Sequence, residues 1–216
     1  MTHEAPRGSK QGDDVPDVDP VVGRVVPADA DEATDSMFKE RIVVVTSLDD
    51  EAGAMLVSQL ITLDRADPKK EISLFINSAG GSGRAALALY DAVQYVRCPV
   101  ATVCVGQARA EAAMILASGA AGLRSALPSS RILIQQPSSS YSGTVSEAEQ
   151  AAAEATALHR SFVDIYVRHC GREVEEVERD MDRGLLLTAS DAVGWGLIDA
   201  ILERPHGPWS GILPGA

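Results

Sequence analysis

Short aliphatic runs alternate with amphipathic stretches through the middle of the chain, and this alternation limits the fold more than any other feature. Four runs rich in Val, Ile and Leu are typical of buried strands, at 42–45, 72–76, 100–105 and 132–134. Three amphipathic stretches have the apolar spacing of helices, at 50–64, 84–96 and 110–118. Strand–helix–strand alternation at this spacing predicts an α/β domain whose strands pair in parallel. A last helix and strand are expected between 190 and 202.

The longest amphipathic stretch lies at about 145–170. Its apolar positions run from Ala148 through Leu158 and Phe162 to His169 and recur with a period near 3.6 residues. A helix of this length is longer than one domain needs to cover its sheet. We therefore expect it to project and to pack its apolar stripe against another subunit.

The two ends of the chain differ from its middle. Residues 1–36 hold nine acidic side chains against three basic ones, and no aromatic residue. Such a segment cannot bury enough apolar surface to become ordered, although a short strand near 21–27 is an alternative. We predict a disordered acidic tail over 1–36, a folded domain over 37–204 and a loose C-terminal tail over 205–216.

Charge and composition exclude several classes of function. The net charge of −12 argues against a nucleic-acid partner, because phosphate binding needs a basic surface. Three cysteines without paired spacing favour a reduced compartment over a disulfide scaffold. No apolar run reaches the roughly 18 residues of a membrane span, and the first residues contain no apolar signal region. We therefore expect a cytoplasmic globular protein with no metal, no cofactor and no membrane partner.

Three short segments near the expected strand ends carry the chemistry. They are Phe-Ile-Asn-Ser-Ala-Gly-Gly-Ser at 75–82, Gly-Gln-Ala at 106–108 and Ile-Leu-Ile-Gln-Gln-Pro at 132–137. A glycine pair between a strand and a helix leaves backbone N–H groups free to meet an anion. The first segment is not a P-loop, because no Gly-Lys-Ser/Thr follows it. Each segment alone is a weak signal, but the three in this order and at these separations are specific.

Together the segments resemble the proteolytic subunit of the ATP-dependent Clp protease. The likeness runs almost without gaps from about Met37 to Leu202 and includes Ala-Val-Gly-Trp-Gly-Leu-Ile-Asp at 192–199. The resemblance implies an α/β fold of repeated ββα units, related to the crotonase fold. In that family a projecting handle helix joins two seven-membered rings face to face. The helix expected at 145–170 is similar to that handle.

The Ser-His-Asp triad of that family is missing from the matching positions. The resemblance places Ala110 at the nucleophilic serine, Gln135 at the histidine and Gly184 at the aspartate. Alanine has no oxygen to attack a carbonyl, a glutamine amide cannot take a hydroxyl proton near neutral pH, and glycine has no carboxylate to orient an imidazole. Neither Asp182 nor Cys104 completes a second triad. The chain is therefore expected to lack catalysis.

Other sites of the family also fall on identifiable residues. The resemblance places the two backbone donors of the oxyanion hole at Gly81 and Glu111. A Glu111 carboxylate near a developing oxyanion would oppose it electrostatically, and the alternative is that Glu111 is an ordinary acid in the first turn of a helix. The family's apolar ATPase-docking pocket falls on Ile61, Phe75, Tyr95 and Leu202.

The resemblance favours a catalytically inactive subunit with a structural or regulatory role in a Clp peptidase ring. Its expected partners are other Clp proteolytic subunits, in rings and double rings, and a Clp ATPase of the AAA+ class. Two other functions stay open. One is an active serine endopeptidase that uses other catalytic groups, and the other is a decoy that binds peptides or small-molecule Clp ligands. Family members often carry an N-terminal propeptide, and without a nucleophile this chain would not remove residues 1–36 itself.

Overall fold

Seven strands form one sheet in the computed structural model, which describes residues 30–137 and 145–203. The strands are β1 (Ile42–Val45), β2 (Ile72–Ser78), β3 (Val100–Arg109), β4 (Arg124–Ala126), β5 (Arg131–Ile134), β6 (Leu185–Thr188) and β7 (Ala200–Ile201). The order β1-β2-β3-β4-β7 is parallel throughout, while β5 pairs in parallel with the end of β3 and antiparallel with β6. The predicted α/β class with parallel pairing is confirmed.

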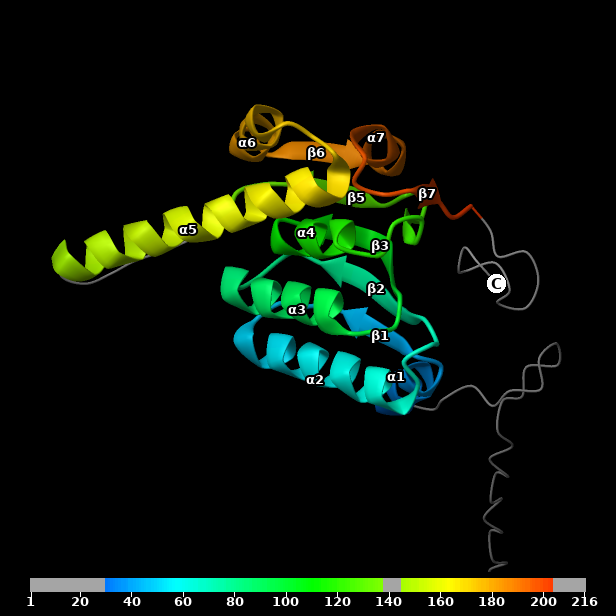
Figure 1. The fold of residues 1–216 in the computed structure, drawn as a ribbon. Helices are drawn as coiled ribbons and strands as arrows, with labels where there is room; N and C mark the ends of the chain where they lie inside the picture. Colours follow the sequence, from blue (N-terminus) through cyan, green and yellow to red (C-terminus); the bar gives the residue numbers. More distant parts are fainter. Residues whose placement is uncertain (1–29, 138–144, 204–216) are drawn as a thin grey trace, which may run out of the picture.

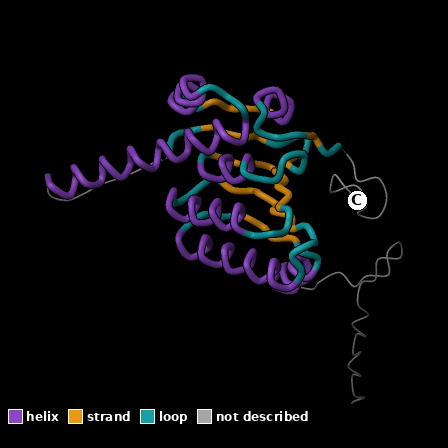
Figure 2. Tube along the Cα trace, viewed as in Figure 1, coloured by secondary structure: helices purple, strands orange, loops and turns teal. Residues whose placement is uncertain are grey.

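Helices alternate with most of these strands. They are α1 (Ala30–Lys39), α2 (Asp50–Ala66), α3 (Gly83–Tyr95), α4 (Glu111–Ala117), α5 (Val145–Cys170), α6 (Val174–Asp182) and α7 (Ala189–Trp195). The helices α2, α3 and α4 lie along one face of the sheet, and α5 runs next to α4 (Figure 1). Figure 2 shows this layering as a row of helices beside the row of strands.

Side-chain caps fix where α2 and α3 begin. The Asp49 carboxylate accepts the N–H of Ala52 at 2.9 Å, and the Ser82 hydroxyl accepts the N–H of Ala85 at 3.3 Å. The two helices approach so closely that a Cβ on Gly53 would lie 2.8 Å from the Cβ of Ala85. Glycine at this position therefore sets the spacing of the helix layer.

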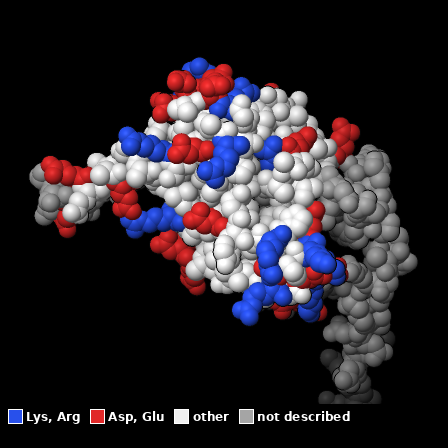
Figure 3. Space-filling model, in the orientation of Figure 1, with Lys and Arg blue, Asp and Glu red and all other residues white. Residues whose placement is uncertain are grey.

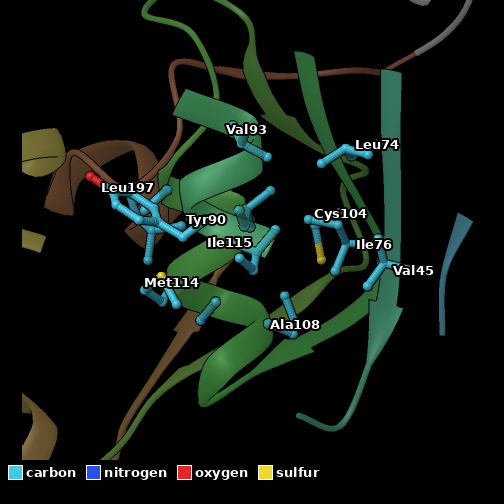
Figure 4. Packing of buried hydrophobic residues seen from close by; sticks show 14 of the residues in the cluster. Val45, Leu74, Ile76, Tyr90, Val93, Cys104, Ala108, Met114, Ile115 and Leu197 are labelled. Carbon is cyan, nitrogen blue, oxygen red and sulfur yellow. The ribbon is translucent and has the colours of Figure 1, made fainter. Parts of the chain in front are cut away.

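The core lies between the sheet and the helix layer (Figure 4). Leu74 and Ile76 of β2 are fully buried, and they lie on the side of β2 that faces Ile115 of α4, next to Cys104 of β3. Every residue of α4 is buried. Burial of a large aliphatic side chain contributes about 1.5–3 kcal/mol. This packing holds α4, and the turn that precedes it, in a fixed position.

Helix α5 covers the range predicted for the handle, but much of its apolar stripe faces its own domain. Phe162 and Tyr166 are fully buried, and Leu158 packs so closely on Gly83 that a Cβ there would lie 2.5 Å from the Leu158 Cδ2. The expectation that this stripe covers another subunit is therefore wrong from Leu158 onward. The part of α5 before Leu158 extends beyond the sheet and the other helices (Figure 1).

The boundaries of the folded part also differ from the prediction. Helix α1 begins at Ala30, so the segment predicted to be a disordered tail ends in a helix. Strands β4 and β6 and helix α6 have no counterpart in the sequence analysis. The rest of the predicted tails, 1–29 and 204–216, lies outside the described residues. Within the described parts of the chain, none of the helices combines the length and the apolar character needed to cross a membrane.

Candidate functional site

The structure brings Ala110, Gln135 and Gly184 to the ends of three neighbouring strands. Residue 110 follows β3, residue 135 follows β5, and residue 184 precedes β6. The last pair of β3 with β5, Arg109 with Leu133, adjoins residue 110. The last pair of β5 with β6, Ile134 with Leu185, adjoins residues 135 and 184. The N–H of Ala110 also donates to the carbonyl of Leu133 at 2.9 Å, which continues the pairing of β3 with β5. Three positions that are distant in sequence therefore meet at one edge of the sheet.

Ala110 has a backbone conformation that alanine rarely adopts, with φ at +48° and ψ at −112°. Holding an L-residue in such a region costs about 1–3 kcal/mol. A strained turn from a strand into a helix is the device by which α/β-hydrolases expose a nucleophile. At Ala110 the same kind of turn presents a methyl group, which has no nucleophilic atom.

A glycine loop follows β2 and contacts the start of α4. Gly80 has φ at +102°, which glycine adopts without strain. The N–H of Ser82 donates to the carbonyl of Leu48 at 2.7 Å, and Leu48 and Gly81 form a parallel bridge. On its other side the loop meets Glu111, because the N–H of Gly81 donates to the Glu111 Oε2 at 3.1 Å. The two residues predicted for the oxyanion hole are thus in direct contact.

Glu111 is a buried acidic residue, with only 2% of its surface exposed. Its second carboxylate oxygen, Oε1, and the hydroxyl of Tyr166 are both buried without a hydrogen-bond partner among the described residues. Burial raises the pKa of Tyr166 well above its usual value, and the nearby Cys170 and Glu111 raise it further. Glu111 does lie in the first turn of α4, as one alternative expected, but its carboxylate turns toward the glycine loop instead of toward solvent.

The groups that could replace a triad have other partners. Asp182 accepts a hydrogen bond from the Nε2 of Gln136, a contact that the sequence analysis did not predict. The Nε2 of His169 lies 3.2 Å from the hydroxyl of Tyr90, and burial lowers the pKa of His169, with two neighbouring arginines lowering it further. Burial raises the pKa of Cys104 to about 11, so its thiol stays protonated at neutral pH.

Comparison with known families identifies the family of the chain. The sequence model of the Clp protease family matches residues 27–205. The chain belongs to the Clp protease family. The match begins before α1, so residues 30–36, predicted as tail, are part of the Clp protease domain. The resemblance seen in the sequence is confirmed, and the family match spans every described element of the fold, including α1.

The four residues predicted for ATPase docking in this Clp protease chain come from separate elements. Ile61 lies on α2, Phe75 on β2, Tyr95 at the end of α3, and Leu202 after β7. Tyr95 is 82% exposed and Ile61 41% exposed, whereas Phe75 and Leu202 are half-buried. Docking of an ATPase at these residues stays a prediction. Over the described residues, no group of three or more His, Cys, Asp or Glu side chains is arranged to hold a metal ion.

Proposed function

We propose that this chain is a noncatalytic subunit of a Clp peptidase ring, with a structural or regulatory role in ATP-dependent protein degradation. The turn at Ala110 carries the proposal. Its backbone strain, worth about 1–3 kcal/mol, is retained although the side chain has no nucleophile. The neighbouring strand ends supply Gln135 and Gly184, which offer neither a base nor an orienting carboxylate. A preserved scaffold without reactive groups fits a role in assembly.

The projecting part of α5 supports assembly with other Clp proteolytic subunits. This part is rich in alanine, at 148, 151, 152, 153, 155 and 157. Small side chains allow a neighbouring subunit to approach closely, and each Å² of apolar surface buried contributes roughly 25 cal/mol. The proposed partners are catalytic Clp subunits in rings and double rings, in the cytoplasm. An AAA+ ATPase would dock at the surface that includes Ile61 and Tyr95.

The distribution of charged side chains is compatible with partners that are proteins rather than nucleic acids. Figure 3 shows Lys and Arg side chains interspersed with Asp and Glu over the face that it draws. The net charge of the chain is −12. Contact with a nucleic-acid backbone would need a basic surface instead.

A peptidase assay tests the loss of catalysis. We expect the purified full chain to hydrolyse no fluorogenic tripeptide amide above buffer, and to react with no fluorophosphonate. Ala110→Ser alone should remain inactive, because Gln135 cannot take the hydroxyl proton. Gln135→His and Gly184→Asp must be added before any rate appears, since triad members act as a unit. Turnover by the unaltered chain that Gln135→Ala abolishes would overturn the proposal.

Affinity purification from the native host, followed by native mass spectrometry, tests the assembly role. We expect the chain to co-purify with a catalytic Clp subunit in mixed rings. A chain that stays monomeric alone and with every Clp subunit of its host would exclude the ring role.

A further inference from the structure

The glycine loop lies at the surface, but one of its N–H groups points into the protein. Gly81 is exposed, yet its amide donates to the Glu111 carboxylate, which is almost fully buried. A free amide in such a loop is suited to bind the oxygen of a carbonyl or a carboxylate. In this chain the Oε2 of Glu111 already takes that place.

The surrounding backbone is shaped around this contact. A Cβ on Gly80 would lie 2.5 Å from the Glu111 Oε2, so only glycine at this position admits the carboxylate. On its other side the loop is packed against the backbone of Leu48, because a Cβ on Gly81 would lie only 2.6 Å from it. This contact keeps the loop from moving away from Glu111. The Oε1 of Glu111 has no hydrogen-bond partner in the described part of the chain. Burying a carboxylate with so few donors is costly, so core packing alone does not explain Glu111.

We propose that Glu111 is an internal ligand of the Gly81 amide, and that it keeps carbonyl and carboxylate groups of peptides out of this site. The chain then has a second barrier to catalysis besides its missing triad. Even with a nucleophile restored, the amide that would stabilise an oxyanion is already bound to a negative group. The proposal concerns one hydrogen bond and does not depend on ring assembly.

Amide hydrogen exchange of the full chain, resolved to single residues, tests the proposal. We expect the Gly81 amide to be protected although the residue is exposed. In Glu111→Ala its exchange should accelerate roughly ten- to a hundredfold, the range expected for a lost hydrogen bond to a charged acceptor. Glu111→Gln is the matched control, because its amide oxygen can still accept the N–H, and protection should persist. Sodium acetate should restore protection in Glu111→Ala, whereas sodium chloride at equal ionic strength should not.

The amide of Ser82 is an internal control, because it bonds to Leu48 and not to Glu111. Its exchange should be equal in all three proteins. Acceleration of Gly81 and Ser82 together would show that Glu111 only supports the loop, and would overturn the proposal. Rapid exchange of Gly81 in the unaltered chain would overturn it as well, even if Glu111→Ala failed to fold. Neither result would bear on ring assembly or on the missing triad.

Discussion

The backbone at Ala110 is strained, although its methyl side chain can take part in no reaction. Glycine adopts such a conformation freely, although it loses about 0.5–1 kcal/mol more conformational entropy on folding than alanine. Relief of about 1–3 kcal/mol of strain exceeds that cost. We therefore expect Ala110→Gly to raise the free energy of unfolding by about 1 kcal/mol, measured by urea denaturation.

Ala113 provides the matched control for this substitution. It lies in α4, the short helix that follows Ala110, is fully buried and has helical neighbours on both sides. Ala113→Gly should lower the free energy of unfolding by about 1 kcal/mol, because glycine is unfavourable inside a helix. If Ala110→Gly destabilised the protein as much as Ala113→Gly does, the turn at Ala110 would not be strained.

At the scale of the elements, Arg124 of β4 joins the end of α5 to the segment between α7 and β7. Its guanidinium donates to the carbonyl of His169 at 2.8 Å, to that of Gly196 at 3.2 Å, and to the Asp199 carboxylate at 2.5 Å. Burial by itself would raise the pKa of Asp199, but the hydrogen bonds and charge of Arg124 lower it overall. A carboxyl with a lowered pKa in the folded state stabilises the protein above its ordinary pKa, and loses that contribution as pH falls through the folded value.

Asp199→Asn is accordingly expected to cost about 2–3 kcal/mol at neutral pH, because the guanidinium of Arg124 stays buried without its counter-charge. Urea denaturation should show the difference from the unaltered protein shrinking as the pH falls below the ordinary pKa of an aspartate and through the lowered pKa of Asp199. Asp164→Asn removes an exposed carboxylate from α5 and should change stability by less than about 0.5 kcal/mol at any pH. A difference for Asp199→Asn that stayed constant with pH would mean that charge pairing is not its cause.

The same elements show why only part of the structure could be predicted from the sequence. Strands β1, β2 and β3 are aliphatic runs. Burial on both faces explains that pattern for most of β2 and β3, whereas β1 at the edge of the sheet leaves Val44 exposed. Strand β4 is Arg-Ser-Ala, and it is buried because Arg124 finds Asp199 and backbone carbonyls, which lie far away in the sequence. Helix α6 is mostly acidic and buries only Val177, Asp180 and Met181. Its apolar residues are few, although Val174, Val177 and Met181 recur at helical spacing.

The candidate site, too, could be predicted from the sequence only in part. The matching motifs placed Ala110, Gln135 and Gly184, and the strand register explains how they meet. The hydrogen bond from Gly81 to Glu111 forms next to the strained turn at Ala110. That turn could not be predicted from the sequence, because alanine normally avoids such a conformation.

At the scale of the whole molecule, α5 has an inner part that belongs to the core and an outer part that projects. The apolar stripe continues outward from Leu158 through Ala155 to Ala151, and both alanines are half-buried. Ala153 is exposed, and at 100° per residue it lies on the opposite side of the helix from Ala151. If the outer part of α5 packs against another subunit, as proposed, the stripe rather than the opposite side should meet it.

We therefore expect the double variant Ala151→Glu, Ala155→Glu to separate double rings into single rings in native mass spectrometry of the chain mixed with a catalytic Clp subunit. An unpaired carboxylate costs several kcal/mol when it is buried at a contact, and a ring brings many copies of that contact together. Ala153→Glu should leave the double ring intact, and circular dichroism should find all three proteins equally folded because none of these side chains reaches the core. Double rings that survive both substitutions would place the ring-to-ring contact elsewhere, and dissociation by Ala153→Glu alone would assign it to the opposite side of α5.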